Sequence, residues 1–337
     1  MRYILLDESM PYFKANMHCH STASDGKMTP EELKAHYMQD GYHIIAFTDH
    51  EHLLDHSYLN EDGFLALTAC EIAIKEIPEA STRTRRDMKV CHLNLYARDP
   101  HNIDTPCYSS VADHFLNPSI AHKIVHTKPD FERVYSHEGI TAIIEEANKR
   151  GFLVSYNHPR WSLENARDYL GYQGLWSMEI YNHSCVMDGF PDYNVQAYDD
   201  FLRDGQRIGC VMGDDNHDIH HTLGGATWFN APSLTYGDIV EAMENHRFYC
   251  SQGPLIHSLV VSGRIAQIEF SGADTVIMSH RTRNVQKKTF ADEGRHKATF
   301  EFKKDDGYIR FDLVARDGKR ANTCAYFLDD LGIGVEI

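Results

Sequence analysis

The sequence predicts an α/β protein in which a parallel β/α barrel is followed by a small antiparallel β-sandwich. Three observations predict it: short β-rich runs that end in polar side chains, helical patterns between those runs, and a change to two-residue alternation after Gly253. The chain has 337 residues, and at roughly 150 residues per domain this length suggests two domains. We therefore expect a barrel in residues 1–252 and a sandwich in residues 253–337.

β-rich runs recur along the first two-thirds of the chain. Most are continuous apolar stretches, which is typical of strands buried on both faces of a parallel sheet. They cover residues 12–17, 42–47, 65–70, 88–91, 151–156, 175–180 and 207–212. Most of these runs lead directly into a histidine, an aspartate or a glutamate, so polar side chains gather where the strands end.

Helical patterns lie between several of these runs. Thr29-Pro30-Glu31-Glu32 is a capping box with proline at the first helical position, and Gly41 ends that helix. A second apolar stripe runs from Ile140 to Ala147, and shorter ones lie at 199–202 and 238–243. Strands that alternate with helices indicate β/α architecture, and in a β/α barrel the loops after the strands build the active site.

Beyond Gly253 the pattern changes. Residues 298–302 and 308–313 alternate with period two, and Asp317-Gly318 is a hairpin-type turn. These features predict the antiparallel sandwich, with no chemistry of its own. The polar, irregular stretch 100–136 is expected to cross the mouth of the barrel.

Composition narrows the classes of function. Lys plus Arg number 33 against 49 Asp plus Glu, a net charge of −16, which disfavours a nucleic-acid partner and favours a small molecule. No apolar run has the roughly 18 residues of a membrane span, and the N-terminus lacks the apolar stretch of a signal peptide. The eight cysteines show no framework spacing, which is typical of free thiols. We expect a cytoplasmic protein that does not associate with a membrane. The sequence does not indicate its oligomeric state.

Nine side chains near the ends of the runs have the composition of a transition-metal site. His18 and His20 lie two residues apart, which puts both rings on one side of an extended segment, and Asp215 and His217 repeat this spacing. Imidazoles with three carboxylates suit Zn²⁺, Mn²⁺ or Fe²⁺ better than Ca²⁺ or Mg²⁺. Nine ligands exceed the needs of one ion, so we expect two to three ions, with Glu71 as a bridge. The nine are His18, His20, Asp25, His50, Glu71, His92, His158, Asp215 and His217.

The order of these residues resembles the polymerase-and-histidinol-phosphatase (PHP) family of metallophosphoesterases. The motifs are His18-x-His20 with Asp25, Thr48-Asp49-His50, Glu71, His92, His158-Pro159 and Gly213-x-Asp215-x-His217. The resemblance implies a distorted seven-stranded, TIM-like β/α barrel with a trinuclear centre. It assigns one ion to His18, His20, Glu71 and Asp215, a second to Glu71, His92 and His158, and a third to Asp25, His50 and His217.

The predicted activity is hydrolysis of a small phosphomonoester or cyclic phosphodiester by a hydroxide that bridges two ions. Glu71, Asp215 and His217 are the residues expected at the reacting centre. A barrel followed by a sandwich further resembles the two-domain PHP branch that includes carbamate-ester hydrolases. Hydrolysis of a carboxyl ester or a carbamate is therefore the alternative. A non-catalytic protein with structural metals is a third reading, disfavoured because structural sites are closed four-ligand cages.

Other polar residues beside the motifs have open roles. Arg160 is a candidate clamp for a substrate anion and equally a candidate surface ion pair. His183 is a candidate substrate-binding residue, and His183 or His220 a candidate proton donor to the leaving group. Asp49 is expected to orient a ligand histidine, and Asp214 adds negative charge beside the site. The basic run at 83–86 is either a lip that attracts anions or a solvated loop.

Overall fold

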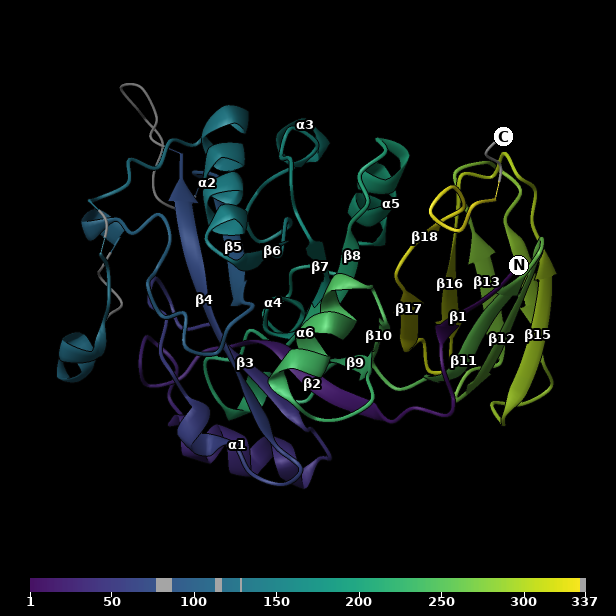
Figure 1. Cartoon of the computed structure of the whole chain (residues 1–337), viewed down its shortest axis with the longest axis horizontal. Coiled ribbons are helices and arrows are strands. Elements are labelled where there is room, and N and C mark those ends of the chain that lie inside the picture. The colour runs from purple at the N-terminus through teal and green to yellow at the C-terminus, as the bar shows by residue number, and fades with distance from the viewer. Residues whose placement is uncertain (77–86, 113–116, 128, 334–337) are drawn as a thin grey trace.

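The computed structural model describes residues 1–76, 87–112, 117–127 and 129–333 of a mixed α/β protein (Figure 1). Its strands are β1 Arg2–Leu6, β2 Tyr12–Cys19, β3 Ile44–Phe47, β4 Leu65–Lys75, β5 Val90–Ala97, β6 Phe152–Tyr156, β7 Ser177–Asn182, β8 Gly209–Gly213, β9 Ala226–Asn230, β10 Phe248–Ser251, β11 Leu255–Ser262, β12 Ile265–Ser271, β13 Thr275–Ser279, β14 Gln286–Thr289, β15 His296–Glu301, β16 Tyr308–Val314, β17 Arg320–Thr323 and β18 Tyr326–Phe327. Its helices are α1 Pro30–Gln39, α2 His137–Lys149, α3 Ala166–Tyr169, α4 His183–Met187, α5 Val195–Arg203 and α6 Tyr236–Glu244, with short 3₁₀ turns at Ser57–Leu59, Ser110–Ala112, Pro118–Lys123 and Ile219–His221.

A large mixed sheet carries the predicted ligands. Along it the strands from β2 to β8 lie in sequence order. Strands β2, β3 and β4 are parallel to one another, and so are β6, β7 and β8. The prediction of parallel strands is wrong for β5, which runs antiparallel to both of its neighbours. The chain reverses between Lys75 and Val90, which pair directly, so no crossover brings β5 back in the direction of β4.

The two ends of this run of strands lie against each other. Cys19 at the end of β2 forms a parallel bridge with Asn216, just after β8. The amide of Asp215 donates to the carbonyl of His18 at 2.8 Å, and the amide of His20 donates to the carbonyl of Asn216 at 3.3 Å. The first and last predicted ligand segments are thus joined through their backbones. A closed seven-stranded barrel remains a prediction.

The C-terminal strands form two facing sheets at the right of Figure 1. One sheet has the order β1-β11-β12-β15, and the other is the continuation of the large sheet through β10, β17, β16, β13 and β14. Apolar side chains such as Ile268, Phe300 and Phe311 are buried between them. The boundary at 252/253 remains a prediction, although β1 pairs with β11 and β10 with β17 across it.

Helices α1 and α2 follow the sequence signals, whereas α3 and α4 were not predicted. The Thr29 hydroxyl accepts from the amide of Glu32, whose carboxylate accepts from the amide of Thr29, so the capping box before α1 is confirmed. Helix α2 buries its predicted apolar stripe, Ile140, Ile143, Ile144 and Ala147. This packing holds the helices on the outside of the sheet and leaves the strand ends to the polar residues.

Two predictions about the chain's general character can be compared with the structure. All eight cysteines are free thiols and all are buried, as predicted. Within the described residues, no helix combines the length and the apolar character needed to span a bilayer.

Candidate metal centre

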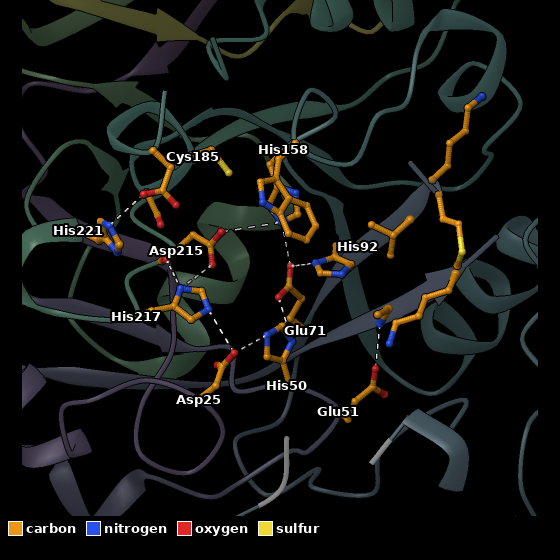
Figure 2. Close-up of a pocket in the computed structure, with 18 residues that line it drawn as sticks. Asp25, His50, Glu51, Glu71, His92, His158, Cys185, Asp215, His217 and His221 are labelled. Atoms are coloured by element: carbon orange, nitrogen blue, oxygen red, sulfur yellow. Dashed lines mark hydrogen bonds and ion pairs between the residues drawn. The ribbon is translucent and has the colours of Figure 1, made fainter. Parts of the chain in front are cut away.

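The structure brings the nine predicted ligands into one cluster at the ends of the strands. Figure 2 shows Asp25, His50, Glu71, His92, His158, Asp215 and His217 turned toward one another across a common centre. Seven of the nine are buried, whereas Asp25 and His217 are half-exposed at the rim. The cluster therefore has a buried side and a side that solvent reaches.

His92 enters this cluster differently from the prediction. It was expected to follow a strand, but it lies near the start of β5. Because β5 is antiparallel, its first residues lie at the sheet edge where the neighbouring parallel strands end. His92 consequently meets Glu71, with its Nδ1 atom 2.9 Å from Glu71 Oε1.

The most buried group consists of His18, His20, Glu71 and Asp215. The Nε2 atoms of His18 and His20 face each other at 3.2 Å. Asp215 Oδ1 lies 3.3 Å from His18 Nε2 and 2.9 Å from His20 Nε2, and Glu71 lies 3.4 Å from each ring. Four donor atoms thus converge on one point.

Two further groups flank this one. Glu71 Oε1 reaches His158 Nε2 at 3.2 Å as well as His92, which makes the second group. In the third, Asp25 Oδ2 lies 3.5 Å from His50 Nε2 and 3.5 Å from His217 Nε2. Glu71 Oε2 also lies 3.2 Å from His50 Nδ1, so this one carboxylate touches all three groups.

These separations suit shared metal ions. Donors about 2.0–2.2 Å from an ion in tetrahedral or octahedral geometry lie about 3.0–3.5 Å from one another, and the contacts above fall in or close to that range. Without an ion, some contacts in this cluster are unfavourable. Two imidazole nitrogens face each other, and the buried His20 Nδ1 makes no hydrogen bond. The residues present therefore fit two or three divalent ions.

The electrostatics of the cluster also favour bound cations. Burial disfavours a charged ring at His18, yet Asp215, Glu71 and Glu179 outweigh it and raise its pKa well above the usual value. Against the same effect of burial, the neighbouring carboxylates raise the pKa of His20 to about 10 and that of His158 to about 9. Burial raises the pKa of Glu71 and Asp215, but the surrounding imidazoles lower both well below their usual range. The carboxylates therefore stay charged at the centre, where a cation would be paired with them.

Sequence reasoning missed one charged residue of the cluster, Glu179. Its Oε1 lies 3.0 Å from His18 Nδ1, and its Oε2 accepts from the backbone amide of His158 at 3.2 Å and from Asn182 Nδ2 at 2.9 Å. It thereby fixes which nitrogen of His18 faces the centre. The available signal was a glutamate between Met178 and Ile180 in the β-rich run 175–180, which becomes the fully buried strand β7.

Local backbone geometry places two of the ligands. His158 has φ +22° and Asp215 has φ +51°, backbone conformations that residues other than glycine rarely adopt. A side chain at Gly213 would meet Cβ of His18 at 2.4 Å, so only glycine lets β8 approach β2 this closely. The strained and tight positions adjoin the ligands, which is typical of functional sites.

Two aspartates beside the ligands have structural partners. Asp49 does not orient a ligand histidine, and that prediction is wrong. Its carboxylate accepts from the amides and hydroxyls of Ser21 and Ser24, which orders the turn that carries Asp25. Asp214 accepts from the Tyr37 hydroxyl and from the amides of Leu223 and Gly224. Burial raises the pKa of Asp214 to about 6 despite these hydrogen bonds.

A cavity of about 490 Å³ opens onto the centre. Neither Arg160, which is exposed, nor His183 is among the described residues that line it. The His183 ring instead accepts or donates a hydrogen bond with the Tyr181 hydroxyl and packs on Gly224. His220 is exposed, whereas the adjacent His221 lines the cavity. The roles predicted for Arg160 and His183 thus remain predictions that the geometry does not favour.

The sequence predicts two segments at the mouth of the site. The described part of the stretch 100–136 contributes no lining residue to this cavity, and its crossing of the mouth stays a prediction. Its Cys107 contacts the carbonyl of Ile143 on α2, and its Arg133 pairs with Glu51 at 2.7 Å. The basic run at 83–86 lies outside the described residues.

The chain matches no known family model and no curated protein. Its neighbours among solved structures include PHP-like metal-dependent phosphoesterases, the family that the ordered motifs resemble. A two-domain protein from Bacteroides vulgatus that contains a predicted PHP-like metal-dependent phosphoesterase is 16% identical, with 96% of each chain covered and a TM-score of 0.47. The lesion-specific endonuclease EndoQ from Pyrococcus furiosus is 14% identical over 69% of this chain and 56% of its own, with a TM-score of 0.42. An amidohydrolase from Chromobacterium violaceum is 16% identical over 61% of this chain and 88% of its own, with a TM-score of 0.38.

Proposed function

We propose that this protein is a metal-dependent hydrolase that cleaves a small phosphomonoester or cyclic phosphodiester. The observation that carries the proposal is the position of Glu71, whose two oxygens reach three separate groups of donors. An assembly of this kind holds adjacent ions, whereas a structural metal needs one closed cage. The acidic net charge of −16 favours a small anionic substrate over nucleic acid.

In this proposal the ions are Zn²⁺, Mn²⁺ or Fe²⁺, held by the three groups described above. When bound, such ions supply an activated water and neutralise the charge that develops on the phosphoryl oxygens. The chain's own part is to hold the donors in place. Glu179 fixes the ring of His18, and Asn157 and Asn182 donate to Glu71 and Asp215 at 2.9 Å and 3.0 Å.

His221 is the residue that we assign to protonation of the leaving oxygen. It lines the cavity, and its Nε2 lies 3.6 Å from Asp188 Oδ1, another lining residue. A carboxylate in this position orients the ring toward the cavity. The assignment replaces His183 and His220, neither of which lines the cavity.

One observation favours a second candidate, a carboxyl-ester or carbamate hydrolase. Of the described residues that line the cavity, none is an arginine, and a carbonyl substrate, unlike a phosphate, needs no guanidinium to bind it in bidentate fashion. Ions held at this centre would activate water for attack on a carbonyl carbon as well as on phosphorus. The two candidates differ in the substrate and share the metal centre.

The test is a substrate panel on protein reconstituted with each metal. Small phosphomonoesters and cyclic phosphodiesters are compared with carboxyl esters and carbamates of the same alcohols, and a chelator control accompanies each. We expect phosphate esters to be cleaved with the higher kcat/KM and chelation to abolish turnover reversibly. Faster cleavage of the carbonyl substrates would establish the second candidate, and full activity in metal-free protein would exclude both.

A further inference from the structure

One arm of the cavity is built by the same pair of strands that carries Glu71 and His92. Side chains alternate along a strand, so Glu71, Ala73 and Lys75 of β4 share one face. The register pairs Ala73 with His92 and Lys75 with Val90. Ala73, Lys75, Val90 and, just before β5, Met88 and Lys89 all line the cavity. The face that holds the metal ligands therefore continues as a largely apolar floor.

Trp161 forms the opposite side of this arm. Its ring lies 5.1 Å from the ring of His158, edge-on, and 5.3 Å from that of His92. It lines the cavity and remains 39% exposed, which is unusual for so large an apolar side chain. Its backbone amide donates to Asp192 at 2.9 Å, which fixes the loop after β6. A tryptophan is thus held open to solvent directly beside two candidate metal ligands.

The charges of the arm exclude one kind of ligand. Lys75 and Lys89 both line it, and Lys89 pairs with Asp168 at 2.6 Å at its outer side. The carboxylates of the cavity lie elsewhere, in the metal groups, at Glu51 and at Asp188. A cationic substituent finds no carboxylate among the described lining residues of this arm, whereas a neutral or anionic ring needs none.

We propose that Trp161, Ala73, Met88 and Val90 form a subsite for the leaving group, and that this group is a neutral or anionic aromatic ring. This inference rests on the proposed function, because the metal centre then holds the group that is cleaved. An aromatic ring offers edge and face contacts to the indole and buries apolar area against the β4–β5 floor. A short alkyl leaving group makes few of these contacts, so the subsite selects aryl over alkyl esters.

Kinetics on the full chain test this selection. Trp161→Ala is expected to raise KM for phenyl phosphate about fivefold, with KM for methyl phosphate changed less than twofold. Trp161→Phe should restore most of the affinity, because it keeps an aromatic face. The matched control is Leu163→Ala, a substitution of an exposed apolar residue in the same loop that does not line the cavity. Metal content is measured for each variant, since Trp161 contacts His92 and His158.

Binding separates a failure of this inference from a failure of the proposed function. Phenylphosphonate, which is not hydrolysed, is titrated into metal-loaded protein while tryptophan fluorescence is followed. Quenching that Trp161→Phe removes supports the subsite, even if no ester is cleaved and the proposed function fails. Equal KM changes for phenyl and methyl phosphate, with no quenching by phenylphosphonate, would overturn the subsite and leave the hydrolase proposal standing.

Discussion

The two halves of the molecule bury charged groups in different ways. In the C-terminal sheets, Arg310 on β16 is 2% exposed, and its guanidinium meets Asp199 at 2.8 Å and 3.0 Å and also Asp312. Each of these charges has an opposite partner. At the strand ends of the other half, imidazole nitrogens and carboxylate oxygens point at a common centre, and His20 Nδ1 makes no hydrogen bond.

This difference distinguishes buried charges that stabilise the fold from buried groups that form a candidate binding site. In the Arg310 set, Asp199 of α5 also lies 3.5 Å from Arg203, so two guanidinium groups meet two carboxylates and every charge is compensated within the protein. The metal-centre set has more electron-pair donors than protons to share between them, and that surplus fits the binding of cations. Four substitutions test this contrast, and they are ordered from the largest expected effect to the smallest.

Glu71→Gln should have the largest effect, because Glu71 contacts all three donor groups. We expect it to lose more than one metal equivalent and all measurable hydrolysis. His217→Ala is the matched variant, since His217 belongs to one group only, and it should lose about one equivalent. Metal content by elemental analysis after gentle purification checks both. Equal losses in the two variants would contradict the bridging role of Glu71.

Arg310→Met should lower the free energy of unfolding without changing the metal content of the folded protein. Removing one partner of a buried ion pair leaves the others uncompensated and costs about 3–5 kcal/mol of unfolding free energy. Arg295→Met, which breaks exposed pairs with Glu8 and Glu269, should cost no more than about 1 kcal/mol. Denaturant unfolding measures both, and metal per folded chain should stay unchanged. A loss of metal in folded Arg310→Met would mean that the two kinds of burial are coupled.

Glu164 provides a pH-dependent case within the metal half. It is buried and accepts from the hydroxyls of Tyr135, Tyr156 and Tyr172. Burial raises its pKa to about 7 although these hydrogen bonds lower it. A raised carboxyl pKa means that the folded state binds the proton more tightly than the unfolded state. The contribution of Glu164 to stability is therefore present below its unfolded pKa near 4.5 and is lost as the pH rises to about 7.

Glu164→Gln should remove this pH dependence. The difference in unfolding free energy between the two proteins is expected to change by about 3 kcal/mol between pH 4.5 and pH 7.5, in the direction that favours the variant at high pH. Metal-free protein is used for both, so that ligand protonation cancels in the comparison. A constant difference across this range would show that Glu164 titrates normally.

The sequence predicts those features of the site that local sequence patterns determine, and it misses those that depend on distant parts of the chain. The structure brings all nine ligands together. Their order and the rule that strand ends meet at one edge predict the others, whereas His92 reaches the site from the start of β5. The direction of β5 depends on a chain reversal that no local pattern signals. Likewise, β1 joins β11 across the length of the chain. Arg160 lies next to His158 in sequence, yet the direction of its side chain depends on the fold of the loop, and it is Trp161 that lines the cavity.

The smallest expected effect concerns Glu179, which sequence reasoning missed. Glu179 forms a buried charge pair, as Asp199 does, but its partner is a candidate metal ligand. Its carboxylate pairs with His18 as Asp199 pairs with Arg310, but the His18 nitrogen that it leaves free belongs to the metal groups. Glu179→Gln keeps the shape and removes the charge that makes His18 a stronger ligand. Partners of this kind typically change metal affinity by about 10–100-fold, and we expect a loss in that range, measured by competition with a chromophoric chelator. Glu164→Gln is the matched control, because it makes the same change in a buried carboxylate that contacts none of the nine residues. If both variants bind metal as the unmodified protein does, Glu179 has a structural role, like the charges around Arg310. His18 would then belong to the metal centre and Glu179 would not.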